Sequence, residues 1–199
     1  MKHNLKKITI SACAVLLLIA GCGKKEEPKK ETIKIVSNDV YETPIKPTLE
    51  GKKAYNKLSK ALDGDNSAKI AENVAINFAY DFFTLSNKKD ENQIGGLTFI
   101  PEASRAEFTN YALSYYYGNY KSIVNKYGKE ALPYMTSCVV KKSEEASLMY
   151  QDLTYDGFMI TLNCKYKESD LSQEKLKTKM VVQVIYDNTD AVYRVIAVQ

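Results

Sequence analysis

Few side chains in this chain have the types and spacing needed for acid–base or metal chemistry. His3 is the only histidine among 199 residues, and histidine is both the commonest side chain for acid–base catalysis near neutral pH and the commonest metal ligand. Asp81 is the most informative acid, because it follows Phe78 by three residues and precedes Leu85 by four, at the border of a helix's apolar face. Asp81 could act as a base, or it could be a hydrogen-bonded or boundary acid that anchors its helix to the sheet, and its position leaves both hypotheses open.

The thiol of Cys22 follows a short apolar segment near the start of the chain. Three lysines among the first seven residues precede an apolar run over residues 8–20, which is shorter than the ~20 residues of a membrane-spanning helix. These features are typical of a signal peptide, and the sequence Leu-Ile-Ala-Gly-Cys that ends at Cys22 resembles the lipobox of bacterial lipoproteins. The resemblance implies cleavage before Cys22, attachment of diacylglycerol to its sulfur, and a location on the cell membrane facing outside the cytoplasm. The alternative is an ordinary signal peptide with an unrelated cysteine.

Cleavage would remove residues 1–21, with three lysines, no acidic residue and His3, so the formal charge would fall from +4 to +1. Ser-His-Asp and Cys-His arrangements then become impossible within one chain, and Gly95-Gly96 is a turn signal rather than a phosphate loop. We therefore predict a protein that is not an enzyme and that uses no metal ion or cofactor. The near-neutral charge, without a concentrated basic face, also predicts no binding of nucleic acid.

Six tyrosines fall within seventeen residues of the chain's middle. Tyrosine combines apolar area with a hydroxyl group, which suits sugar stacking or a protein interface. Tyr111 and Tyr115 share a helix face with Phe108 and are expected in the core. Three consecutive tyrosines cannot all face inward on one helix, so an exposed partner-binding patch is predicted, with scattered rim tyrosines as the alternative. The predicted patch consists of Tyr116, Tyr117 and Tyr120.

Cys138 and Cys164 remain after the predicted cleavage, in a compartment that permits disulfides. A turn near Lys142 and another after Tyr155 would each place one of these cysteines opposite Met149. The two cysteines would then lie two strands apart, at about 9–10 Å, beyond the ~7 Å limit for a disulfide. A bulge or a different strand order would undo this argument, so the pattern leaves the bridge open.

Composition divides the chain after the signal peptide into a tether and one domain. Residues 22–47 begin with the cysteine to be lipidated, are dense in charge and carry several prolines, so they are predicted to form a flexible tether. Residues 48–199 are long enough for a single domain with its own core. We expect the tether to hold this domain away from the lipid surface.

Helical periodicity fills the first half of the domain, and strand signals fill the second. Apolar residues recur at helical spacing over residues 54–62 and again over residues 70–85, with a stop signal at Asp63-Gly64-Asp65 between them. A third helix starts at Pro101 or at a capping box of Ser104 and Glu107. Asp156-Gly157 is predicted as a two-residue hairpin turn. Helices followed by an antiparallel meander predict an α+β fold, with the N-terminal helices packed on a curled antiparallel sheet. The predicted strands are residues 134–141, 146–155, 158–166, 177–187 and 191–198.

Residues 79–83, Ala-Tyr-Asp-Phe-Phe, precede Gly-Gly-Leu-Thr-Phe and a tyrosine-rich helix. This order resembles the NTF2-like cone fold, and within it the VirB8-like domains of conjugation and type IV secretion machinery, over about residues 66–198. The resemblance implies a non-catalytic assembly subunit, while other members of the superfamily bind small ligands or act as isomerases and dehydratases. It also implies that Asp81 lines the mouth of a cone, where burial would raise its pKa.

These observations predict a lipid-anchored protein that works by binding. The first hypothesis is a scaffold with a protein partner in a cell-envelope assembly, recognised by the tyrosine patch. The second is a lipoprotein that holds a small molecule or glycan in a cavity near Asp81 and Phe82. A histidine-free enzyme with Asp81 as its base is the third.

Overall fold

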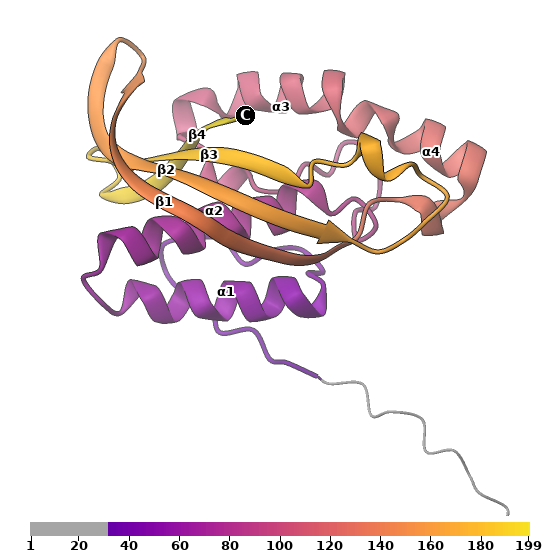
Figure 1. Ribbon diagram of the computed structural model, residues 1–199, viewed down its shortest axis with the longest axis horizontal. Coiled ribbons are helices and arrows are strands. Elements are labelled where there is room, and N and C mark those ends of the chain that lie inside the picture. The colour runs from indigo at the N-terminus through magenta and orange to yellow at the C-terminus, as the bar shows by residue number, and fades with distance from the viewer. Residues whose placement is uncertain (1–31) are drawn as a thin grey trace, which may run out of the picture. The chain divides into compact units, whose positions relative to one another are not determined.

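The computed structural model describes residues 32–199, so the predictions for the signal peptide, for Cys22 and for residues 23–31 lie outside the described part. Helices precede an open antiparallel sheet of four strands, which are joined in sequential order (Figure 1). The predicted α+β class is therefore confirmed. Within the described residues, no helix is long and apolar enough to cross a membrane.

Two long helices form the layers beneath the sheet: α1 (Leu49–Leu62) and α2 (Ser67–Phe83). Each begins at a polar cap, since the Thr48 and Asn66 side chains accept backbone N–H groups of the first turn. Helix α1 packs on α2, and α2 contacts all four strands. The apolar stripe predicted from helical spacing is thus the face of α2 that the sheet covers.

Two shorter helices, α3 (Arg105–Tyr115) and α4 (Tyr120–Tyr127), follow and lie on the upper side in Figure 1. The break between them is confirmed at Gly118, where a β-carbon would lie 2.3 Å from the carbonyl oxygen of Leu113. The predicted capping box is wrong, because the Ser104 side chain makes no capping hydrogen bond. Its hydroxyl instead shares a 2.7 Å hydrogen bond with the hydroxyl of Tyr150.

The sheet differs from the prediction in its first half. One long strand covers nearly all of the first predicted strand and the first half of the second, and the chain then turns at Gln151 and Asp152, both in the left-handed backbone region (φ 49° and 62°). The predicted turn at Asp156-Gly157 is wrong, because both residues lie inside a strand. The strands are β1 (Met135–Tyr150), β2 (Leu153–Tyr166), β3 (Lys179–Asp187) and β4 (Val192–Val198).

Gly157 allows two strands to pack closely and does not form a turn. A β-carbon at this position would lie 2.3 Å from the carbonyl oxygen of Val184 in β3, a distance that no side chain tolerates. From Gly157 the hairpin of β1 and β2 runs on beyond the end of β3. It bends away from the rest of the sheet, as Figure 1 shows at its upper left.

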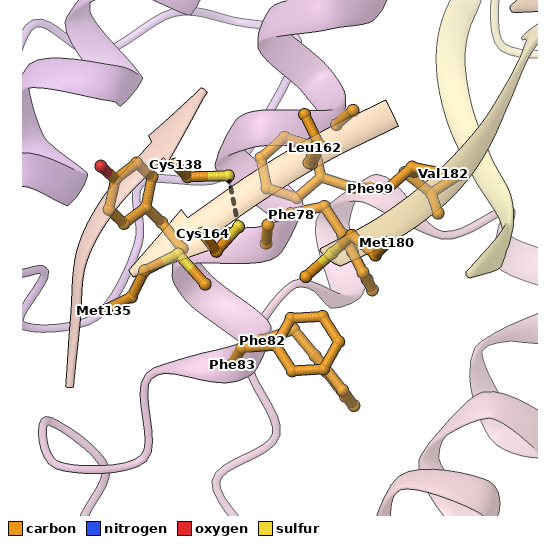
Figure 2. Close-up of a cluster of buried hydrophobic side chains, with 14 of the residues drawn as sticks. Phe78, Phe82, Phe83, Phe99, Met135, Cys138, Leu162, Cys164, Met180 and Val182 are labelled. Carbon is orange, nitrogen blue, oxygen red and sulfur yellow. Dashed lines mark hydrogen bonds between the residues drawn. The ribbon is translucent and has the colours of Figure 1, made fainter. Parts of the chain in front are cut away.

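The corrected register brings the two cysteines together. Cys138 of β1 lies directly opposite Cys164 of β2, and their sulfur atoms are 2.9 Å apart (Figure 2). The predicted separation by two strands is wrong, because the turn near Lys142 on which it depended does not exist.

The described part of the predicted tether, residues 32–47, lies against the domain, and the compact unit begins at Thr32 rather than at residue 48. Tyr41 is 2% exposed, and its hydroxyl donates to the Tyr193 carbonyl of β4 at 2.8 Å. Its own carbonyl accepts from the Tyr55 hydroxyl at 2.5 Å. Tyr41 thus attaches this segment to the sheet through its side chain and to α1 through its backbone.

Candidate functional site

A pocket of about 680 Å³ opens between α2, α3 and β4, a volume that suits a small organic molecule. It contacts four consecutive residues, Val195–Val198. Successive residues of a strand point to opposite faces, so contact with all four means that the pocket reaches the edge of β4, the last strand of the sheet. The other lining residues are Phe78, Phe82, Phe83, Ile100, Pro101, Ser104, Glu107, Phe108, Tyr111, Tyr115, Tyr116, Tyr150, Glu174, Lys175, Leu176 and Lys177.

Aromatic rings from α2 and α3 form the inner wall of the pocket around Phe82. The Phe82 ring stacks on Phe78 and on Tyr116, with centroids 5.4 and 5.5 Å away. It meets Phe108 at 5.1 Å. Phe78 and Phe82 are four residues apart in α2, which places both on one face of the helix. The structure therefore places Phe82, a predicted binding residue, in the wall of the pocket.

Tyr116 lines the same wall and is half-buried. Its hydroxyl donates to the carbonyl of Phe83 at 3.1 Å, at the last residue of α2. Burial raises the pKa of Tyr116 above its ordinary value, so the hydroxyl remains neutral at physiological pH. Tyr116 can thus offer a ligand its ring and the acceptor side of its hydroxyl.

The prediction that Tyr117 and Tyr120 belong to an exposed patch is wrong. Tyr117 is fully buried and Tyr120 is 6% exposed. The backbone leaves the helix at Tyr115 and makes a short turn over Tyr117–Asn119, so helical spacing no longer tells where these side chains point. The Tyr117 hydroxyl donates to the Phe82 carbonyl at 2.8 Å and accepts from the Gly95 N–H at 3.0 Å.

Tyr111 and Tyr115, which were expected in the core, are the exposed tyrosines. They are 59% and 70% exposed, and their ring centroids lie 4.7 Å apart. Both line the rim of the pocket beside Phe108. The rim therefore presents two adjacent aromatic rings to solvent, ready to cover a bound molecule.

Asp81 is a hydrogen-bonded acid, as the second hypothesis predicted, but it anchors the loop that follows α2 and not the sheet. One carboxylate oxygen accepts from the ammonium group of Lys88 at 2.7 Å, and the other accepts from the Gly96 N–H at 2.7 Å. Lys88 is 2% exposed, so the charged pair is shielded from water on the lysine side. Asp81 is not among the residues that line the pocket, and the geometry does not support its use as a catalytic base there.

Gly95 lets the loop approach α2 closely enough for these hydrogen bonds. A β-carbon on Gly95 would lie 2.2 Å from the Asp81 carbonyl oxygen and 2.8 Å from the Lys88 ammonium nitrogen. Gly95 and Gly96 lie in irregular backbone just before the short helix Leu97–Phe99, and the close contact is the reason that glycine is needed at Gly95.

Charged side chains occupy the outer rim. Glu107 of α3 and Glu174, Lys175 and Lys177, which precede β3, are all exposed, and none forms an ion pair with another described residue. Both signs of charge are therefore free to meet a polar group on a ligand. Among the described residues, no cluster of three or more histidine, cysteine or acidic side chains could hold a metal ion.

Sequence reasoning missed most of this pocket. Phe108, Tyr111 and Tyr115 were identified as one helix face, but that face was assigned to the core. The contribution of β4 could have been found from the sequence, because the last strand of a predicted meander has one unpaired edge.

No protein-family model matches the sequence, and neither a curated protein nor a solved structure shows significant similarity to it.

Proposed function

We propose that this protein is a lipid-anchored, extracytoplasmic binding protein that holds an apolar or aromatic small molecule in the pocket between α3 and β4. The single observation that carries the proposal is the aromatic lining of a pocket of about 680 Å³. Ligand pockets are mostly apolar, with a few polar groups that orient the ligand. Phe82 and Phe108 supply the apolar wall, and the charges of Glu107 and Lys175 supply the polar rim.

The lipid anchor is supported by the sequence ending at Cys22, and the assignment to the NTF2-like cone fold by the order of helices and antiparallel strands. In such a cone the pocket would be the cavity that small-ligand-binding members use. Intact-mass measurement of the protein from membranes tests the anchor, because a diacylated chain starting at Cys22 has a defined mass.

Binding of the uncharged fluorescent probe N-phenyl-1-naphthylamine to the full chain tests the pocket. We expect saturable binding at one site. Replacement of Phe108, Tyr111 or Tyr115 with alanine removes a ring from the wall or the rim, so each variant is expected to weaken binding roughly tenfold, as the loss of an aromatic contact would.

Tyr127→Ala is the matched control, since Tyr127 is half-buried in α4 and does not line the pocket. It should bind the probe like the native chain. Unchanged affinity in all three pocket variants, with their folds intact by circular dichroism, would contradict the proposal.

A second candidate function is a scaffold for a protein partner in the cell envelope, and the hairpin of β1 and β2 favours it. Met149 and Leu153 flank the turn and are 73% and 60% exposed. Exposed apolar side chains at the end of a projecting element are typical of an interaction site. The surface of this scaffold would be the hairpin tip, not the patch of Tyr116, Tyr117 and Tyr120. Its test is the replacement of Met149 and Leu153 with serine.

A further inference from the structure

Cys138 and Cys164 are paired in the sheet in a way that suits a covalent bond. They lie directly opposite each other on neighbouring antiparallel strands, and the thiol of Cys164 donates to the sulfur of Cys138 at 2.9 Å. Directly opposed residues have α-carbons about 4.5–5.5 Å apart, and disulfides need about 4.4–6.8 Å. A bond between the two sulfurs therefore requires no movement of the strands.

The backbone hydrogen bonds show which kind of pair this is. The N–H of Cys164 donates to the carbonyl of Thr178 at 2.8 Å, on the β3 side, and so points away from β1. In an antiparallel ladder, a residue whose backbone faces one neighbour forms a non-hydrogen-bonded pair with the other, and side chains in such pairs lie closest together. Cys138 and Cys164 are thus in the arrangement that brings two β-carbons within reach of a disulfide.

The surroundings of the two thiols favour a disulfide over a metal site. Figure 2 shows both sulfurs in the apolar cluster that contains Met135, Phe78 and Leu162. Structural zinc needs four ligands, and no third ligand that could complete a metal site is present among residues 32–199. The hydrogen bond with Cys164 and burial raise the pKa of the Cys138 thiol, which keeps it unreactive once the sheet has formed.

We propose that Cys138 and Cys164 form an intramolecular disulfide as the protein folds outside the cytoplasm. The oxidant is a second disulfide, on a protein or a small molecule, which exchanges with the two thiols. One cysteine, as thiolate, attacks a sulfur of the oxidant, forming a mixed disulfide and releasing one thiol. The other cysteine, as thiolate, attacks the mixed disulfide, which forms the Cys138–Cys164 bond and releases the second thiol. Two electrons pass to the oxidant, and its two released thiols carry the two protons.

Burial explains both when the bond forms and why it persists. The two cysteines are 7% and 4% exposed, so an oxidant reaches them before β1 and β2 close over α2, and a reductant is later kept away. The inference uses the export proposal only for the oxidising surroundings. It is independent of any ligand in the pocket.

The test is the state of the two thiols in the full chain taken directly from its own cells. The cells are lysed in acid and denaturant, free thiols are blocked with N-ethylmaleimide before any reduction, and peptides are analysed by mass spectrometry. We expect the peptides of Cys138 and Cys164 to be recovered linked, without N-ethylmaleimide, and to separate after reduction. Recovery of both cysteines blocked, or of either linked to another cysteine, would overturn the proposal.

A stability measurement provides the second readout. The bond would close a loop of 26 residues, and a loop of this size corresponds to a rise in Tm of roughly 10 °C. Unfolding and refolding of the native full chain in dithiothreitol, which exposes the buried bond to the reductant, should therefore lower its Tm by about that amount. The double variant C138A/C164A is the matched control, and its Tm should not respond. An equal response in both proteins would show that no bond between these residues stabilises the fold.

Discussion

At the scale of single residues, several polar groups hold the loop that follows α2 against the rest of the domain. Asp81 and Lys88 form a shielded ion pair, with side chains 14% and 1% exposed. Tyr120 donates to the carbonyls of Lys88 and Lys89 at 3.1 and 3.2 Å. A buried ammonium group is tolerated only when an anion and hydrogen bonds compensate its lost hydration. Asp81, the most informative acid in the sequence, thus stabilises the structure that carries the pocket.

Substitutions in this ion pair should show strong coupling. Asp81→Asn leaves the Lys88 ammonium buried without an anion, and we expect it to lower the free energy of unfolding by about 3 kcal/mol. Lys88→Met should cost less, about 1 kcal/mol, because Asp81 keeps the Gly96 N–H and some exposure to water. The double variant should be more stable than the sum of the two predicts.

Urea unfolding of the four proteins measures this cycle. Additive effects of the two substitutions would show that the pair does not contribute as a unit. Probe binding provides the second readout, because a structural Asp81 predicts normal affinity for N-phenyl-1-naphthylamine in any variant that remains folded.

At the scale of elements, the hairpin of β1 and β2 is the most distinctive feature. It turns at Gln151 and Asp152, both at positive φ, a region in which aspartate is found more often than glutamine. Its base belongs to the sheet, and Tyr150 near its tip bonds to Ser104 at the start of α3. The hairpin therefore contributes Tyr150 to one end of the pocket, while Met149 and Leu153 remain exposed near its tip.

The hairpin tip separates the two proposed functions. If it binds a partner, lysine-directed cross-linking in intact membranes should repeatedly capture the same envelope or secretion subunits, and M149S/L153S should lose them. Val139→Ser is the matched control, because Val139 is an exposed apolar residue (45%) of β1 away from the tip. Both variants should bind the pocket probe normally. Capture that M149S/L153S leaves unchanged would contradict a role of the tip.

At the scale of the whole domain, the segment before α1 connects parts that are distant in the sequence. Tyr41 contacts Phe99 with ring centroids 5.0 Å apart, and the guanidinium group of Arg194 lies 5.9 Å from the centroid of the Tyr41 ring. Arg194 in turn donates to the Thr98 carbonyl and pairs with Asp190 at 2.8 Å. These contacts join the N-terminal segment, the loop after α2 and the last strand into one unit.

Replacement of Tyr41 tests this connection. Tyr41→Ala removes a ring that is 2% exposed and should cost about 3–5 kcal/mol of unfolding free energy. Tyr41→Phe keeps the ring, loses only the bond to Tyr193 and should cost about 1 kcal/mol. Hydrogen exchange should show lost protection over residues 32–47 in Tyr41→Ala alone. Similar exchange in Tyr41→Ala and the native chain would show that other contacts hold the segment.

The sequence alone predicted the α+β class and most helices, because these depend on local patterns. Apolar residues spaced by three and four mark the face of α2 that the sheet buries, and Gly118 marks the break between α3 and α4. The prediction of a signal peptide and of a lipobox at Cys22 also came from the sequence alone, because it depends only on the local order of residues. Such features need no knowledge of what lies opposite them in space.

Only the tertiary structure decided which side chains meet. Gly157 has the sequence context of a turn, yet it lies in β2, where the absence of a side chain lets Val184 of β3 come close. Because the chain turns at Gln151 and Asp152 and not near Lys142, Cys138 pairs with Cys164. Tyr117 is buried because a short turn redirects the chain after α3, whereas Tyr111 is exposed because its face of α3 lies at the rim of the pocket and not in the core. Strand register and side-chain direction outside regular helices are set by contacts between distant segments, and a one-residue shift reverses every face.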